Sequence, residues 1–199
     1  MNINFILNKF NITNDDIMGI FRTGGSLLLD NCKDEDYIII YNKTDTFRQD
    51  YFSIKDREQN IDYFGYSMDL FNELSTFSLE LYTPSINRFR QMFLISMFLS
   101  ENIKNNGLKF DLIGQGEKFK QAAIDACELS FINPNVTWEG HEEYCQKHLW
   151  YVILGLMFIE NNSYEITPEM KEIVQKCHDG CLPKSWEDWV KERLYTDNK

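Results

Sequence analysis

Two glycines and a serine, followed by two closely spaced aspartates, are the residues of this chain best suited to chemistry. Gly24, Gly25 and Ser26 indicate a sharp turn, because glycine has no Cβ and lets the backbone approach a ligand closely. Asp34 and Asp36 follow, separated by a single residue. Backbone amides and a serine hydroxyl can hold phosphate oxygens, and carboxylates are the hard oxygen ligands that magnesium prefers. The pattern therefore predicts a site for a nucleotide and a divalent metal.

Two predicted strands flank this turn and would position its residues. The apolar run 17–21 is typical of a buried strand, and the β-branched and aromatic run 37–41 predicts a second one. Side chains alternate along a strand, so Asp34 and Asp36 share one face, about 7 Å apart, and Glu35 lies on the other. The alternative is an ordinary turn followed by a solvated acidic entry into a strand.

This stretch resembles the polymerase-β-type nucleotidyltransferases, whose signature is a Gly-Ser turn followed about ten residues later by Asp-x-Asp on a strand. Such a site usually takes a third carboxylate from a neighbouring strand, and Asp62 and Asp69 are the candidates. Asp62 lies in the predicted strand 61–66, whereas Asp69 lies in the helix predicted to follow. The resemblance implies that Asp62 completes the metal site or acts as the base for the attacking hydroxyl.

The resemblance extends to one branch of this superfamily, the predicted nucleotidyltransferases of the RNA-repair-pathway, polymerase-β-like type, which are common in bacteria and their phages. An Ile-Asp-x-x-Gly-Trp strand, a Leu-Glu-Trp-Leu segment and a helix with a basic pair and a Tyr-Val-Leu run mark that branch. The similar segments here are 61–66, 79–81 and 147–154, and residues 166–168 resemble the Pro-marked start of the next helix. Lys147 is the basic residue that still lies where a phosphate contact is expected.

Cations of the branch are missing at three places in this chain. Leu27 stands directly after the serine, where the branch usually has an arginine. Asp69 and Leu70 replace a basic pair, and Leu154 replaces a late arginine of the C-terminal helix. Each lost cation removes an expected phosphate partner. Two interpretations therefore stay open: an active nucleotidyltransferase, or a catalytically inactive protein of this fold that binds a nucleotide or a partner.

The activity implied by the resemblance is transfer of a nucleoside monophosphate from a nucleoside triphosphate to a hydroxyl, with release of pyrophosphate and with Mg²⁺ or Mn²⁺ as cofactor. The residues implied for nucleotide binding are Gly24, Gly25, Ser26 and Lys147. Those implied for catalysis and metal binding are Asp34, Asp36 and Asp62. The acceptor could be an RNA end, a protein side chain or a small molecule.

Composition places the chain among folded proteins with a substantial core. Of its 199 residues, 43% are hydrophobic and 15% are aromatic, which is too apolar for a disordered tail. The formal net charge is −11, from 31 acidic and 20 basic residues. That balance argues against strong non-specific binding to nucleic acid, which depends on a basic surface. A long nucleic acid is therefore the least favoured acceptor.

Cysteine content and apolar runs bear on where the protein works. Its five cysteines, an odd number, fit a reducing compartment better than a disulfide framework. Residues 1–10 lack the basic start and long apolar segment of a signal peptide, and the apolar run 149–159, at eleven residues, is too short to span a bilayer. We expect a cytoplasmic protein without a membrane segment. A zinc site between the histidines and cysteines of 141–148 and 177–181 is an alternative assignment for those residues.

The pattern of elements predicts an α+β fold, with a small mixed β-sheet in an N-terminal nucleotidyltransferase-like catalytic lobe (1–105) and a helical C-terminal lobe (106–199). The predicted strands are 17–21, 37–41, 47–54 and 61–66. The predicted helices are 3–10, 67–77, one running from 85 to a break at 105–107, then 115–130, 138–161, 168–179 and 185–194.

Overall fold

The computed structural model describes residues 3–29, 32, 34–77, 100–130 and 147–195. The chain divides into two compact units, Met1–Leu74 with Leu99–Phe110, and Ser75–Phe98 with Asp111–Lys199. The first unit contains a mixed sheet and the second is helical, which confirms the α+β class expected from the sequence. The boundary expected after residue 105 falls within the second segment of the first unit.

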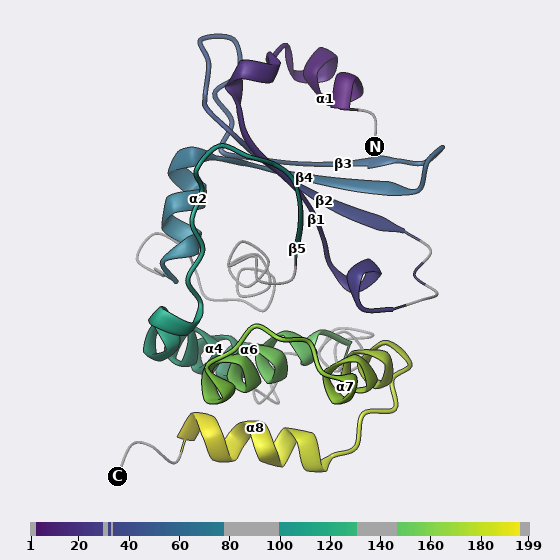
Figure 1. Cartoon of the computed structure of the whole chain (residues 1–199), viewed down its shortest axis with the longest axis vertical. Helices are drawn as coiled ribbons and strands as arrows, with labels where there is room; N and C mark the ends of the chain where they lie inside the picture. Colours follow the sequence, from purple (N-terminus) through teal and green to yellow (C-terminus); the bar gives the residue numbers. More distant parts are fainter. Residues whose placement is uncertain (1–2, 30–31, 33, 78–99, 131–146, 196–199) are drawn as a thin grey trace. The chain divides into compact units, whose positions relative to one another are not determined.

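A five-stranded sheet in the order β3-β4-β2-β1-β5 forms the first unit (Figure 1). Its elements are α1 (Ile3–Phe10), β1 (Ile17–Thr23), the 3-10 turn η2 (Gly25–Leu27), β2 (Glu35–Tyr41), β3 (Tyr51–Asp56), β4 (Ile61–Ser67), α2 (Met68–Ser75) and β5 (Ser100–Asn105). Strands β2 and β4 are parallel, and the other neighbouring pairs are antiparallel. The turn after β1 and the start of β2 therefore meet at the centre of one end of the sheet.

Apolar side chains cover both faces of this sheet. On one face, the buried Ile6 of α1 belongs to a core cluster that includes Tyr37 of β2. On the other face, Phe110 contacts Phe21 of β1 edge-on, with ring centroids 5.5 Å apart, and Phe71 of α2 at 5.6 Å. Burial on both faces explains why the central strands are continuous apolar runs rather than an alternation of apolar and polar residues.

Strand β5 overturns one expectation. The apolar spacing predicts a helix that continues to about residue 104, but Ser100–Asn105 pairs antiparallel with β1. At the edge of the sheet a strand tolerates polar and charged residues, so Glu101 is exposed and Ile103 keeps 47% of its surface in solvent. The earlier part of that predicted helix, residues 85–99, lies outside the described residues.

The described part of the second unit contains the helices α4 (Gly116–Ser130), α6 (Trp150–Asn161), α7 (Pro168–His178) and α8 (Ser185–Tyr195) (Figure 1). Helix α6 contacts the other three, and its residues from Trp150 to Phe158 are all buried, as expected of a helix that is apolar on every side. The predicted helices at 115–130, 168–179 and 185–194 are confirmed. Of the long helix predicted from 138, residues 138–146 lie outside the described part of the chain.

Capping explains where α7 begins. The Thr167 side chain accepts a hydrogen bond from the Met170 amide at 3.2 Å, and Pro168 occupies the first helical position, which has no need of an amide hydrogen.

Arg193 of α8 lies over the ring of Trp189, 3.8 Å from its centroid, and its Nε is 2.7 Å from a carboxylate oxygen of Glu160. The ion pair of Arg193 with Glu160 links α8 to α6. Among the described helices, none is long and apolar enough to cross a membrane.

Candidate functional site

Gly24 turns the chain at the end of β1, directly beside Asp36. Its φ of 83° and ψ of −165° fall in a region that is essentially restricted to glycine. Thr23, the residue before it, is the register partner of Asp36. A Cβ added to Gly24 would lie 2.5 Å from Asp36 Oδ2, too close for non-bonded atoms. Both the backbone conformation and the approach of this carboxylate therefore require glycine here.

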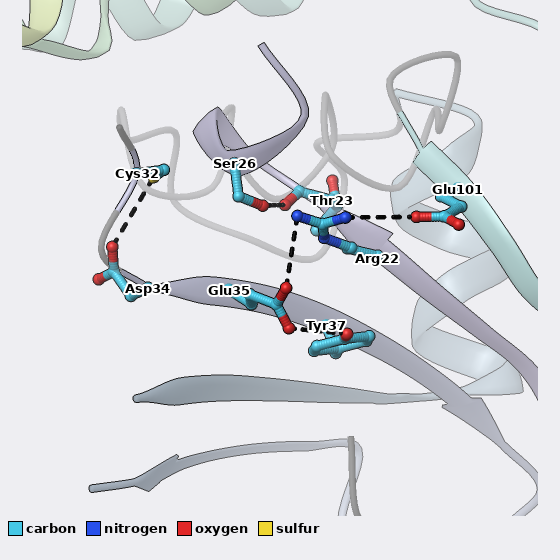
Figure 2. A network of polar contacts seen from close by, with 8 residues as sticks. All are labelled: Arg22, Thr23, Ser26, Cys32, Asp34, Glu35, Tyr37 and Glu101. Atoms are coloured by element: carbon cyan, nitrogen blue, oxygen red, sulfur yellow. Dashed lines mark hydrogen bonds and ion pairs between the residues drawn. The ribbon is translucent and has the colours of Figure 1, made fainter. Parts of the chain in front are cut away.

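The rest of the turn presents hydrogen-bond donors. The amides of residues 27–29 donate to the carbonyls of Gly24 and Gly25, and the Ser26 hydroxyl donates to the Thr23 carbonyl at 3.3 Å (Figure 2). Among the described residues, the amides of Gly25 and Ser26 have no backbone partner of this kind outside regular elements. These two amides, and the hydroxyl once it releases the Thr23 carbonyl, are the groups of the turn that could hold a phosphate oxygen.

Asp36 and Asp62 are brought together by the parallel pairing of β2 and β4. They are direct register partners on the same face, and neighbouring strands lie roughly 4.8 Å apart. Both side chains are partly buried. Asp34 lies at the bend that leads into β2, where the Cys32 thiol donates to its Oδ1 at 3.9 Å (Figure 2). The pairings thus place Asp36 next to the Gly-Gly-Ser turn and Asp62 beside Asp36 on the next strand, with Asp34 at the entry to β2.

Lys55 of β3 supplies positive charge at these carboxylates, and the sequence interpretation missed it. Its Nζ lies 3.1 Å from Asp62 Oδ2, because Lys55 and Asp62 are partners in the antiparallel pairing of β3 with β4. The hydrogen bond to Asp62 raises the pKa of Lys55, and the charges of Asp62, Asp34 and Asp36 add to the effect. The sequence interpretation placed residues 55–60 in a charged connector. Placing the hairpin turn at 57–60 could have identified the pair, because a hairpin turn fixes the register of its strands.

Magnesium fits this part of the sheet by the chemistry of the donor set. Proteins usually bind it through one or two carboxylates together with substrate phosphates, and Asp36 and Asp62 offer two such groups on adjacent strands. In the described residues, no three or more histidine, cysteine, aspartate or glutamate side chains are arranged to hold a metal ion. The three-ligand set Asp34, Asp36 and Asp62 therefore stays a prediction, and the pair Asp36 and Asp62 is its best-placed part.

A second polar network occupies the opposite face of β1 and β2 (Figure 2). Arg22 reaches Glu35 at 3.4 Å and Glu101 at 3.5 Å, which links three neighbouring strands. The Tyr37 hydroxyl donates to Glu35 at 2.9 Å, and burial together with this hydrogen bond raises the pKa of Tyr37 to about 12. Glu35 is thus held on the face away from Asp36, as strand alternation predicts.

The missing cations of the resembled branch are replaced by packed apolar side chains. Leu70 is 4% exposed and Leu154 is fully buried, and Leu27 is partly buried. Because an unpaired charge is costly to bury, neither of the two buried positions suits a phosphate-binding cation. Asp69 forms an ion pair of 2.9 Å with Lys43. Lys147 belongs to the second unit, where its side chain is exposed.

The residues considered for zinc include two core side chains. Burial raises the pKa of the Cys177 thiol to about 12, which opposes the thiolate that zinc requires. His148 is buried and stacks on Tyr151, with ring centroids 6.0 Å apart. His141 and Cys145 lie outside the described residues. Cys177 and His148 are therefore explained by core packing.

Comparison of the chain with models of known protein families and with curated proteins gives no match.

Replacing Gly24 by alanine should disturb the site through Asp36. Alanine is strained at this positive φ, and its Cβ must displace the carboxylate. We expect the free energy of unfolding to fall by about 2 kcal/mol and the affinity for Mn²⁺ to fall about tenfold. Urea denaturation and calorimetric titration with Mn²⁺ measure the two effects.

Gly107→Ala is the matched control for this substitution. Gly107 has a similar φ of 85°, but no heavy atom lies within 4 Å of where its Cβ would be. The control should therefore lose stability through backbone strain and keep the Mn²⁺ affinity of the wild type. If Gly24→Ala and Gly107→Ala bound Mn²⁺ equally well, the contact with Asp36 would have no role in the site.

Proposed function

We propose that this protein is a nucleotidyltransferase of the polymerase-β type, which transfers a nucleoside monophosphate from a nucleoside triphosphate to a hydroxyl with Mg²⁺ or Mn²⁺. One observation carries the proposal: the strand register brings the Gly-Gly-Ser turn, Asp36 and Asp62 together at one end of the sheet. A metal–triphosphate complex is positioned by donors that hold its phosphates and by carboxylates that hold its metal. The turn would supply the donors, and the two adjacent strands would supply the carboxylates.

The proposed roles follow from position. The amides of Gly25 and Ser26 and the Ser26 hydroxyl would hold oxygens of the triphosphate, and Asp36 and Asp62, with Asp34, would hold the metal. A bound metal ion would neutralise the charge that develops on the transferred phosphoryl group. Asp62 would alternatively accept the proton of the attacking hydroxyl. A phosphate contact of Lys147, which belongs to the second unit, stays a prediction of the resemblance.

The charge balance favours a small molecule or a protein side chain as acceptor over a long nucleic acid. A net charge of −11 repels a phosphate backbone, and the face of the sheet that carries Arg22 has its guanidinium already paired with Glu35 and Glu101. We also propose that the protein works in the cytoplasm, because cysteine thiols stay reduced in that compartment.

A catalytically inactive binding protein of the same fold is the second candidate. The observations that favour it are the burial of Leu70 and Leu154 where the resembled branch has cations, and the engagement of Asp62 by Lys55. On this alternative the turn binds a nucleotide, or the surface binds a partner, without turnover.

A transfer assay with radiolabelled nucleotides tests the proposal. Wild type and Asp34→Ala/Asp36→Ala are incubated in cell lysate with each of the four ribonucleoside triphosphates and Mg²⁺ or Mn²⁺, labelled at either the α- or the γ-phosphate. Label that passes from the α-position, but not the γ-position, to an acceptor only with wild type supports nucleotidyl transfer and shows the acceptor class. ATP binding by calorimetry without transfer supports the second candidate. Absence of both transfer and ATP binding would contradict the nucleotide site, and would leave only partner binding from the second candidate.

A further inference from the structure

Lys55 and Asp62 form an ion pair that can open without disturbing the sheet. The pair spans β3 and β4, and β3 is one of the two edge strands of the sheet. The Lys55 side chain is 48% exposed and that of Asp62 is 23% exposed. Lysine carries its charge on a long flexible stem, so its ammonium group can swing away while the backbone stays paired.

We propose that Lys55 is a built-in counter-cation of the site, which occupies Asp62 in the nucleotide-free protein and moves to the triphosphate when the metal–nucleotide complex binds. The inference rests on the proposed function and specifies what weakens the binding of free metal in the absence of a nucleotide. It also identifies a positive charge for the phosphates in a chain that lacks cations at Leu27, Leu70 and Leu154.

Competition follows from the position of the ammonium group. Its Nζ is 3.1 Å from Asp62 Oδ2, so a dication bound to that oxygen would lie within a few Å of another positive charge. Two like charges at such a separation repel each other. Metal binding to Asp62 therefore requires Lys55 to leave, and the phosphates that arrive with the metal offer it a new partner.

A comparison with Lys43 separates this arrangement from an ordinary structural ion pair. Lys43 lies 2.7 Å from Asp50 and 2.9 Å from Asp69, so two carboxylates hold it, one directly before β3 and one in α2. Lys55 makes one ion pair among the described residues, and exposed pairs of this kind contribute little to stability. Lys55 is thus held weakly enough to be displaced by a ligand.

The test measures binding of Mn²⁺ to the full chain by calorimetry, first alone and then with the α,β-methylene analogue of ATP, which cannot transfer its nucleotidyl group. In Lys55→Gln, we expect Mn²⁺ alone to bind about two- to fivefold more tightly than in wild type, because its competitor is gone. Binding of the analogue in the presence of Mn²⁺ should weaken about tenfold, because a charge-assisted contact is lost. A purely structural role would not move the two affinities in opposite directions.

Two further variants serve as controls. Lys55→Arg keeps the charge and should retain at least part of the competition with Mn²⁺. Lys104→Gln removes the same charge from β5, where the Lys104 ammonium donates to the Asn14 carbonyl at 2.7 Å, and both affinities should stay at the wild-type value. Thermal denaturation checks that all three variants fold like the wild type.

Equal Mn²⁺ affinity in wild type and Lys55→Gln would overturn the role of Lys55 and leave the proposed function standing. Failure of every variant to bind Mn²⁺, with or without the analogue, would remove the metal site itself, and with it both the proposed function and the inference. Tighter Mn²⁺ binding together with weaker analogue binding in Lys55→Gln supports both.

Discussion

Asp36→Asn should slow nucleotidyl transfer by about a thousandfold. Asp36 is the carboxylate that faces both the Gly-Gly-Ser turn and Asp62, so its charge is central to holding the metal. Metal ions contribute several kcal/mol of charge stabilisation in such reactions, and about 4 kcal/mol corresponds to a factor of roughly 10³ in rate. The measurement is the initial rate of pyrophosphate release at saturating triphosphate, with the acceptor identified by the labelling assay.

Glu35→Gln is the control for Asp36→Asn, because it removes one negative charge from the adjacent residue on the opposite face. Glu35 pairs with Arg22 and Tyr37 rather than with the site. We expect transfer within about threefold of wild type and a loss of less than about 1 kcal/mol in stability, since exposed ion pairs contribute little. Equal loss of activity in both variants would contradict the assignment of the two faces.

Leu154→Arg should destabilise the second unit rather than restore a phosphate contact. Leu154 is fully buried in α6, a helix whose residues from Trp150 to Phe158 are all buried. An arginine there has to bury a guanidinium group without a partner, which costs several kcal/mol out of a total stability of about 5–15 kcal/mol. We expect a loss of about 5 kcal/mol and a fall in Tm of roughly 10–20 °C, measured by circular dichroism.

Leu154→Met provides the matched substitution at this position, with similar volume and no charge. It should cost less than about 1.5 kcal/mol. A Leu154→Arg protein that melted near the wild-type temperature and bound ATP more tightly would contradict this expectation. Position 154 would then contact the nucleotide, as the resemblance implies, and would not be a core position.

The central strands and the capped helices could be predicted from local sequence. The runs 17–21, 37–41 and 61–66 are rich in β-branched and aromatic residues, and each lies within an observed strand. Thr167 and Pro168 mark the start of α7 by local capping chemistry. In each case, the information that decides the structure lies within a few neighbouring residues.

Elements whose structure depends on distant partners were harder to predict. Strand β5 lacks an apolar alternation and is a strand because it pairs with β1, far away in the chain. The third strand was expected at 47–54 and lies at Tyr51–Asp56, because its register is set by the hairpin with β4 rather than by its own pattern.

The same distinction applies to the candidate site. The closeness of Gly24 to the Asp34–Asp36 stretch follows from short spacing, and the opposite orientation of Glu35 follows from alternation. The neighbour relation of Asp36 and Asp62 was reached through a family resemblance, and the structure supplies its basis in the parallel register of β2 and β4. Lys55 was missed because its role depends on a register that no local pattern specifies.

The route of the chain between the units limits how the protein can be dissected. The sheet unit is discontinuous, since Leu99–Phe110 returns to it after residues that belong to the helical unit. A fragment ending at residue 74 would therefore lack β5 and leave one side of β1 with open hydrogen-bonding groups, a template for self-association. The smallest contiguous piece that carries the whole sheet also carries residues 75–98 of the other unit. Neither unit is thus a contiguous, independently transferable module, and variants of the intact chain are the appropriate material for studying the site.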